Sequence, residues 1–376
     1  MLEVYAFGSN GNYQLGLGHA DDIIVPQLSL SLHLPNDITV QKIACGGNHT
    51  LLLLSNGDVY GCGSNAKGQI SDDSSIEMVP NWIMLDQKNV KDIACGWEFS
   101  VLLDKDNDVL VRGYGPKGEL GLGENIIEAT SFKKVMSIPN GFTCKIFTSF
   151  QNVTLLLDAI DGNNSIVYGW GSNTKCQLLT PKSKSVWNPT VIYESKSDQI
   201  ERVAMGKNFI LLCNDKGSIC SVAGAIPETF NLTEWGNKEE LDVYVFWSSI
   251  HIYYQGQIFS YGFGVHGQIF DNDHFYKTVM KDKDTRLVSI NTGSEHGMLV
   301  TKSKGIPEYI IYCWGWGEHG NCGRVKGDQP EDKPIINDYS NLTSKLNDVM
   351  HIESNIPPSV FGGCASTWIV KYTQFK

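Results

Sequence analysis

The sequence is short of charge and of long apolar runs. Charged residues make up 19% of its 376 residues, below the ~25% of an average soluble protein. Apolar residues make up 41%, which is too many for a disordered chain. No apolar run approaches the roughly 18 residues of a membrane-spanning helix, and the opening MLEVYAFGSN lacks the basic and apolar regions of a secretory signal. We therefore expect a folded protein that neither crosses a membrane nor enters the secretory route.

Basic residues are in deficit. The chain has 30 Lys and Arg against 41 Asp and Glu, so its formal net charge is −11. A protein that binds nucleic acid or an anionic membrane through surface charge needs a clustered excess of Lys and Arg. The charge balance therefore argues against direct contact with either partner.

Motifs for metal binding and catalysis are lacking as well. The ten Cys form no Cys-x-x-Cys pair, which favours small buried side chains over a zinc site or a disulfide framework. The sequence contains neither a Gly-x-x-x-x-Gly-Lys-Ser/Thr phosphate loop nor a Gly-x-Ser-x-Gly nucleophile elbow. We expect no metal, no cofactor and no enzymatic activity.

Glycine is in excess, and it marks a repeat. Its 38 residues are about 10% of the chain, against a usual ~7%. An apolar strand that ends in Gly recurs seven times, beginning at Val4, Val59, Val109, Val167, Ile219, Ile258 and Ile311. Five of the six intervals fall between 50 and 58 residues, and the interval from Ile219 to Ile258 is 39. Such regularity indicates a repeat architecture.

A second motif precedes each recurrence of the first. It reads apolar-x-x-Gly-x-x-His or aromatic, then an apolar strand, and begins at Ile43, Ile93, Ile146, Val203, Val245, Ile290 and Val360. In this alignment Ser149 and Ser248 replace the Gly, and His49, His251 and His296 occupy the His position. Asn, Gly and Asp turns such as Ser55–Asp58 join the two motifs, which predicts a β-hairpin in each repeat.

The two ends of the chain each carry an unpaired strand. Val4–Gly8 has no upstream partner and Thr367–Tyr372 has no downstream partner, so pairing them would close a ring and remove two exposed edges. We expect an all-β, seven-bladed β-propeller that spans residues 1–376 as one domain, with about four strands per blade and a loop insertion at 324–358 in the last blade. A pair of β-sandwiches is the alternative, and it does not explain the sevenfold repeat. The 39-residue interval leaves open a deformed blade or an opening in the ring.

The repeat resembles a known family. The segment FGSNGNYQLGLG (Phe7–Gly18), with IACGGNHTLLLL and VYGCGSN, resembles the regulator-of-chromosome-condensation repeat over nearly the whole chain. Four segments are similar to a fungal branch of that family, the killer-toxin-insensitivity or α-tubulin-suppressor propellers: GWGSNTKCQL (169–178), TGSEHG (292–297), YCWGWGEHGNCG (312–323) and FGGCASTWIV (361–370).

The resemblance implies a function that the residues alone do not. The fungal branch implies a heterodimer with a small CSL-type zinc-binding diphthamide-synthesis protein, an indirect link to the Elongator complex, and a cytoplasmic or nuclear location. It further implies support of wobble-uridine modification in tRNA and of diphthamide formation on elongation factor 2. The founding member of the family keeps an alternative open, a guanine-nucleotide exchange factor for a Ran-like GTPase that uses His49, Glu295 and His296. A purely structural or ubiquitin-ligase-like recognition module is a third hypothesis.

Candidate partner-binding residues come from the second motif. In a propeller this motif starts the strands near the axis, so its side chains gather around one mouth of the central channel. Large aromatic residues at such a rim are typical interface hot spots. The expected partner-binding residues are His49, Trp97, Phe150, Phe209, Trp247, His251, Glu295, His296 and Trp368. The alternatives are packing between blades for the aromatic residues and a hydrogen bond to a neighbouring-blade carbonyl for the histidines.

Overall fold

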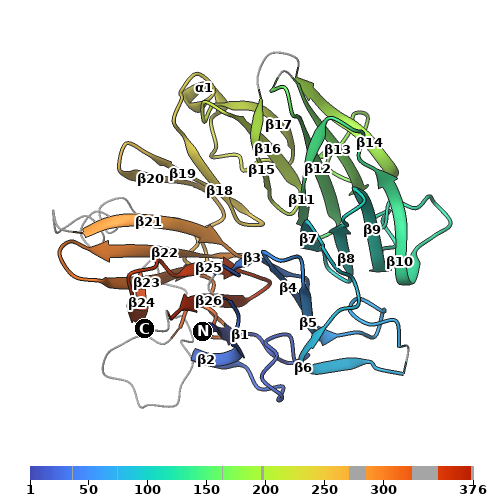
Figure 1. The fold of residues 1–376 in the computed structure, drawn as a ribbon. Coiled ribbons are helices and arrows are strands. Elements are labelled where there is room, and N and C mark those ends of the chain that lie inside the picture. Colours follow the sequence, from blue (N-terminus) through green and yellow to red (C-terminus); the bar gives the residue numbers. More distant parts are fainter. Residues whose placement is uncertain are drawn as a thin grey trace.

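The protein is a ring of seven antiparallel sheets in the computed structural model, which describes residues 1–35, 37–73, 75–162, 164–195, 199–270, 285–323 and 346–373 (Figure 1). Each sheet is one blade, and the blades are numbered here in chain order. The fold is therefore the seven-bladed β-propeller that the repeat predicts.

Blades 1 to 3 each have four strands in chain order. Blade 1 comprises β3 (Val40–Cys45), β4 (His49–Leu54), β5 (Val59–Ser64) and β6 (Met78–Met84). Blade 2 comprises β7 (Asp92–Cys95), β8 (Phe99–Leu103), β9 (Asp108–Tyr114) and β10 (Glu128–Ser137). Blade 3 comprises β11 (Phe142–Ser149), β12 (Asn152–Ala159), β13 (Ser165–Ser172) and β14 (Ser185–Ser195).

The remaining blades vary. Blade 4 comprises β15 (Ile200–Met205), β16 (Phe209–Asn214) and β17 (Ile219–Gly224), and blade 5 comprises β18 (Asp242–Val245), β19 (Ser249–Tyr254) and β20 (Gln257–Gly262). Blade 6 comprises β21 (Thr285–Thr292), β22 (His296–Ser303), β23 (Glu308–Gly315) and β24 (Asn347–Glu353). Blade 7 joins β25 (Ser359–Gly362) and β26 (Ser366–Tyr372) to β1 (Leu2–Gly8) and β2 (Ile23–Leu32).

The closing blade confirms the predicted pairing of the two chain ends. β1 lies antiparallel to β26 through seven residue pairs, from Leu2 opposite Tyr372 to Gly8 opposite Ser366. The amino group of Met1 also donates to the carbonyl of Thr373 at 2.8 Å. The first and last strands thus sit side by side in the interior of one sheet, where neither is an edge.

The short 39-residue interval is a deformed blade. Every residue between β17 and β18 is described. This segment holds the one-turn helix α1 (Leu232–Trp235) where the four-stranded blades have their fourth strand. The indole of Trp235 is buried against Tyr254, Phe259 and Tyr261 of blade 5. The segment therefore crosses to the next blade without adding an outer strand, which corrects the expectation of four strands for blade 4.

The expected insertion at 324–358 is partly regular structure. Residues 347–353 of it form β24, which pairs with β23 from Asn347 opposite Cys313 to Glu353 opposite Glu308. This part is the outer strand of blade 6 and not a loop. Residues 324–345 lie outside the described part of the chain.

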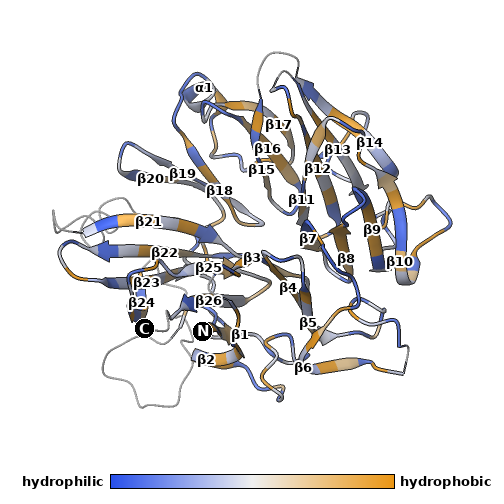
Figure 2. Cartoon of the chain, viewed as in Figure 1, coloured by the Kyte–Doolittle hydropathy of each residue, from blue (hydrophilic) through white to orange (hydrophobic). Residues whose placement is uncertain are grey.

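The core lies between neighbouring blades. The second strand of a blade packs on both faces, so it reads as a continuous apolar run: Leu51, Leu52, Leu53 and Leu54 of β4 are all fully buried. Apolar residues follow the strands in the same way in β8 and β12 (Figure 2). Because both faces of these strands are covered, the sequence shows no polar alternation there.

The Gly that ends the first motif has a steric reason. Each of the seven has a positive φ, and a Cβ on it would lie within 2.6 Å of a backbone carbonyl oxygen in the preceding hairpin. At Gly63, for example, φ is +105° and the added Cβ would lie 2.5 Å from the carbonyl oxygen of Asn48. Only glycine avoids both the strain and the contact.

Candidate interaction face at the channel mouth

The innermost strand of every blade faces a central cavity of about 480 Å³. These strands, β3, β7, β11, β15, β18, β21 and β25, all run in the same direction along the axis, because each starts its blade. Lys42 and Arg202 line the cavity near the strand starts, and Trp97, Phe150 and Trp247 line it just beyond the strand ends. The strand ends thus define one mouth, which we call the channel mouth.

One hydrogen bond recurs in all seven blades and fixes which residues are equivalent. The residue after the strand-ending Gly donates its N–H to a carbonyl in the turn after the innermost strand, at 2.7–3.2 Å. The seven acceptors are Asn48, Glu98, Gln151, Asn208, Ser248, Glu295 and Ala365. The residues that follow them, and so occupy the His position of the second motif, are His49, Phe99, Asn152, Phe209, Ser249, His296 and Ser366.

This equivalence corrects the alignment of blade 5. Ser249, and not His251, occupies the His position there, and Phe246 takes the place of the Gly. The Phe246 N–H donates to the Ser249 carbonyl at 2.9 Å, just as the Gly46 N–H donates to the His49 carbonyl at 2.8 Å. The sequence alignment was two residues out of register, a shift that keeps each side chain on the same side of a strand.

Three of the expected residues meet at the channel mouth. The rings of Trp97 and Phe150 lie 5.2 Å apart, those of Phe150 and Trp247 lie 5.3 Å apart, and those of Trp97 and Trp247 lie 6.1 Å apart. All three side chains are half-buried. They come from blades 2, 3 and 5, and we call them the mouth trio.

Backbone hydrogen bonds between blades hold the mouth trio in place. The Trp97 N–H donates to the carbonyl of Phe150 at 2.8 Å, and the Trp247 N–H donates to the carbonyl of Ser294 at 2.6 Å. Lys207 of blade 4 donates its N–H to the Trp247 carbonyl at 3.0 Å, and its ammonium lies 4.3 Å from the Phe150 ring centroid and 5.3 Å from that of Trp247. The rings are thus preorganised, and a cation–π contact covers part of them.

Glu295 lies beside the mouth trio. Its carboxylate accepts from the Ser248 hydroxyl at 2.7 Å and from the Gln268 amide at 3.4 Å. Burial raises the pKa of Glu295, and the two hydrogen bonds and the Lys207 charge oppose that rise. Of the nine expected residues, Trp97, Phe150, Trp247 and Glu295 are therefore the ones that reach this surface.

The other five expected residues are inside the blades. His49, Phe209, His251, His296 and Trp368 are at most 2% exposed. Side chains this deeply buried do not contact a partner that docks on the mouth, so the expectation of direct contact is corrected for these five. Phe209 and Trp368 belong to the apolar core, which was the alternative weighed for them.

Two of the buried histidines, His49 and His296, bridge neighbouring blades, whereas His251 bonds Ser249 and Ser260 of its own blade. The Ser100 hydroxyl donates to the carbonyl of Gln69 at 2.9 Å, so its oxygen is left to accept from Nε2 of His49, also at 2.9 Å. Thr367 and His296 repeat the arrangement at 2.9 Å, with the Thr367 hydroxyl donating to Asn321. His49 and His296 bond a hydroxyl of the next blade, where the sequence alternative named a carbonyl.

Burial keeps these histidines neutral near neutral pH. It lowers the pKa of His49 and of His251 to about 3 and that of His296 to about 4. Neither His49 nor His296 is therefore available to act on a bound nucleotide. Within the described residues, no three His, Cys, Asp or Glu side chains are grouped so as to hold a metal ion, and no helix is long and apolar enough to span a bilayer.

Sequence reasoning missed the lysines of this end of the propeller. Lys207 contacts the mouth trio, and Lys67, Lys117 and Lys175 lie in loops on the same side. A signal was present, because the last three are each the fourth residue after a strand-ending Gly. The net charge of −11 describes the whole chain and hides this local row of lysines.

Comparison with known proteins finds the same repeat that the sequence resembles. The model described as "Regulator of chromosome condensation (RCC1) repeat" matches residues 3–53 and 56–103, and a second model of that description matches residues 40–69. An RCC1 repeat-containing protein of Schizosaccharomyces pombe is 28% identical, with 97% of each chain covered. Residues 3–103 thus match the RCC1 repeat, and the chain as a whole is similar to an RCC1 repeat-containing protein over nearly its full length.

More distant relatives agree on the fold. The secretion-regulating guanine nucleotide exchange factor of Bos taurus is 23% identical over 88% of this chain and 67% of its own length. The crystal structure of human WBSCR16 superposes with a TM-score of 0.69 at 16% identity, covering 98% of both chains. Prp20p of Saccharomyces cerevisiae, described with its binding to Gsp1p and histones, gives 0.69 at 17% identity, covering 98% of this chain and 91% of its own.

Proposed function

We propose that this protein is a non-catalytic interaction propeller that forms a heterodimer with a small CSL-type zinc protein in the cytoplasm or nucleus. Through that partner it supports Elongator-dependent modification of wobble uridine in tRNA and diphthamide synthesis on elongation factor 2. The observation that carries the proposal is the mouth trio, three preorganised aromatic rings half-exposed at the end of a channel.

The physical case is one of interface energetics. Aromatic side chains held rigidly at a surface lose little conformational entropy on binding and bury a large apolar area. Two or three such anchors within about 800 Å² per partner are enough for a stable interface. Backbone bonds to neighbouring blades already fix Trp97 and Trp247, so a partner meets them in their bound positions.

Nucleotide exchange is the second candidate, and the bovine relative named as an exchange factor favours it. The residues first considered for that role give it little support, because His49 and His296 are buried and uncharged. Only Glu295 of the three reaches the surface. Acceleration of GDP release from a purified Ran-like GTPase would establish this activity, and an unchanged rate would remove it.

The proposal is tested by calorimetric titration of the purified propeller with a purified CSL-type zinc protein from the same genome. We expect a one-to-one complex. Trp97→Ala with Trp247→Ala should weaken it by more than about 1 kcal/mol, or roughly fivefold in Kd. Tyr193→Ala, near the opposite end of the outer strand β14, is the control and should bind as the unaltered protein does. Absence of any complex with the unaltered protein would overturn the proposal.

A further inference from the structure

We infer that the channel-mouth end carries a second recognition element, an arc of three lysines that takes an acidic segment of a partner protein. The arc consists of Lys67, Lys117 and Lys175. The inference rests on the proposed function, since it describes the chemistry of the partner at the same end of the propeller.

The three lysines occupy one structural position in three consecutive blades. Each is the fourth residue after a strand-ending Gly, in the loop between the third and fourth strands. The Lys67 N–H donates to the side chain of Gln69 at 2.8 Å, the Lys117 N–H to Glu119, and the Lys175 N–H to Gln177 at 2.9 Å. Because the same contact fixes each backbone, the lysines are repeated around the ring at the blade spacing.

The arc lies at the same end as the mouth trio. In an antiparallel blade, the turn after the first strand and the loop after the third strand are at one end, and the turn after the second strand is at the other. The recurring hydrogen bond joins the two at the first end, as from Ser64 N–H to the Asn48 carbonyl at 2.8 Å. Lys207, over the rings of Phe150 and Trp247, extends the positive charge from the arc to the mouth trio.

These three cations form no ion pair within the described part of the chain, although the charge of Lys117 acts on the nearby buried Glu119. Lys67 rests instead over the Tyr114 ring at 4.8 Å. Some lysines at the opposite end do pair, as Lys88 with Asp58 at 3.1 Å and Lys105 with Asp106 at 2.8 Å, whereas Lys216 has no ion pair within the described residues. In a chain of net charge −11, a row of unpaired lysines at one end makes that end locally attractive to carboxylates.

Charge complementarity favours an acidic protein over a nucleic acid. The arc stops at blade 4, where Glu228 takes the position of the lysines, and Glu98 and Glu295 lie in the turns around the mouth. A polyphosphate chain long enough to span the face would meet these carboxylates together with the acidic bulk of the protein. A protein segment can place a few carboxylates on the arc and an apolar side chain on the mouth trio, so it satisfies both elements.

The test compares two triple variants of equal charge change. Lys67→Ala with Lys117→Ala and Lys175→Ala removes the arc. Lys88→Ala with Lys105→Ala and Lys216→Ala removes three lysines from turns and connections at the opposite end and is the control. Kd is measured between 50 and 300 mM NaCl for three probes: the CSL-type zinc protein, a peptide of twelve glutamates around a central Trp, and a 20-nucleotide single-stranded RNA.

We expect the arc variant to bind the zinc protein at least tenfold more weakly than the control at 50 mM NaCl, with a flatter salt dependence. The acidic peptide should likewise bind the arc variant more weakly than the control variant. Equal binding of both variants to the zinc protein would overturn the inference and leave the proposed heterodimer standing. Failure of the zinc protein to bind, with arc-dependent binding of the peptide, would overturn the heterodimer and leave the inference standing. Tighter binding of the RNA than of the peptide would overturn the assignment of an acidic protein.

Discussion

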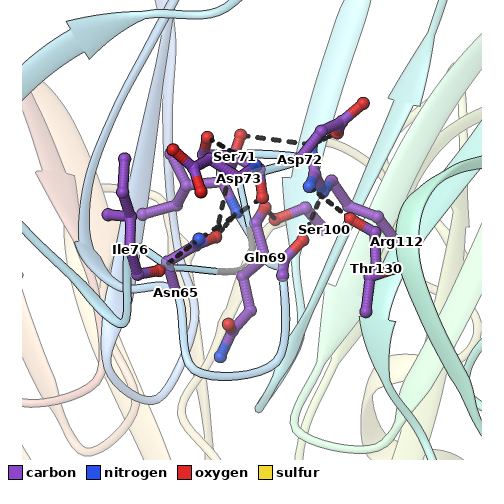
Figure 3. Close-up of polar contacts among 11 residues, drawn as sticks. Asn65, Gln69, Ser71, Asp72, Asp73, Ile76, Ser100, Arg112 and Thr130 are labelled. Atoms are coloured by element: carbon purple, nitrogen blue, oxygen red, sulfur yellow. Dashed lines mark hydrogen bonds and ion pairs between the residues drawn. The ribbon is translucent and has the colours of Figure 1, made fainter.

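Several buried polar residues of this propeller form hydrogen bonds between neighbouring blades. His49 reaches Ser100 and His296 reaches Thr367, each across a blade boundary. Arg112, only 1% exposed, does the same from blade 2 (Figure 3). Its guanidinium donates to the carbonyls of Gly68, Ile70 and Thr130 and pairs with Asp72 at 2.7 Å. Each of these side chains makes polar contacts across a blade boundary, while Nδ1 of His49 and of His296 is buried without a hydrogen-bond partner.

The buried histidines should make the protein acid-sensitive. Their folded-state pKa values, about 3 for His49 and about 4 for His296, lie below the ~6.5 of an exposed histidine. The unfolded state therefore binds more protons, so stability is complete above pH 6.5 and falls as the pH drops towards those values. We expect each of these histidines to lower the free energy of unfolding by about 2 kcal/mol when the pH falls from 7 to 5.

Urea unfolding at pH 7 and pH 5 measures this cost. His49→Gln with His296→Gln should show a smaller loss than the unaltered protein, because the amide keeps a donor for the hydroxyl and does not titrate. Glu119, whose pKa burial raises to about 7, acts in the opposite sense and is present in both proteins. Parallel pH profiles for the two proteins would show that the histidines are not held neutral.

Arg112 should be replaceable by the residue that other blades use. Trp170 and Trp314 also precede a strand-ending Gly, and their indole N–H groups donate to the loop carbonyls of Glu119 and Gln268 at 2.7 and 3.3 Å. We expect Arg112→Ala to lower the free energy of unfolding by about 3–5 kcal/mol, because it leaves the buried carbonyls of Gly68 and Ile70 without their donor. Arg112→Trp should lose less, and exposed Arg286→Ala almost nothing. Equal losses for the Ala and Trp variants in urea unfolding would contradict this equivalence.

At the scale of elements, the repeated unit is a blade whose third strand must end in glycine. The N–H that follows this glycine makes the recurring bond of all seven blades. A side chain at the glycine would push the third strand away from the turn that carries the mouth residues. Blade geometry at the mouth therefore depends on seven backbone positions and not on any one side chain.

Gly171→Ala tests this steric requirement. The added Cβ would lie 2.1 Å from the Gln151 carbonyl oxygen at a φ of +110°, next to Phe150 of the mouth trio. Gly141→Ala is the matched control, since its φ is +90° and nothing lies within 4 Å. We expect a loss of about 1 kcal/mol for the control from backbone strain alone, and roughly 3 kcal/mol for Gly171→Ala. Similar losses in urea unfolding would mean that the close contact is not limiting.

At the scale of the whole molecule, closure of the ring decides stability. β1 contributes Leu2, Val4, Ala6 and Phe7 to the buried core, from a position between β26 and β2. Burying one large apolar side chain is worth about 1.5–3 kcal/mol, and a folded domain has only about 5–15 kcal/mol in total. Without β1, the ring would also expose the edge of β26.

A circular permutant separates closure from chain order. Joining the chain ends by a short Gly-Ser linker and opening the exposed turn between Asp104 and Asp108 keeps every strand pair. We expect the permutant to unfold within about 2 kcal/mol of the parent, since the ends are adjacent and the turn lies at the surface. Deletion of residues 1–8 should abolish cooperative unfolding and cause aggregation. A stable, monomeric deletion variant, followed by calorimetry and light scattering, would refute the role of closure.

The closed ring could be predicted from local patterns in the sequence. Seven strand-ending glycines at a near-constant interval, hairpin turns between them and an unpaired strand at each end were enough to predict a closed seven-bladed propeller, because apolar runs and turn chemistry are local properties. The family motif and the gathering of Trp97, Phe150 and Trp247 at one mouth followed from the same period. The 39-residue interval marked blade 4, where the described residues between β17 and β18 form no outer strand.

Which side chains face outward depends on how the blades pack, and local patterns do not reveal it. His251 and Ser249 differ by two positions, which leaves the alternation of a strand unchanged, so hydrogen bonds to the neighbouring strand had to set the register. Phe209 and Trp368 have the same residue character as the mouth trio, yet blade packing buries them. The lysine arc consists of residues 50 and 58 positions apart in the chain, and it exists as a surface only because the blades repeat around an axis.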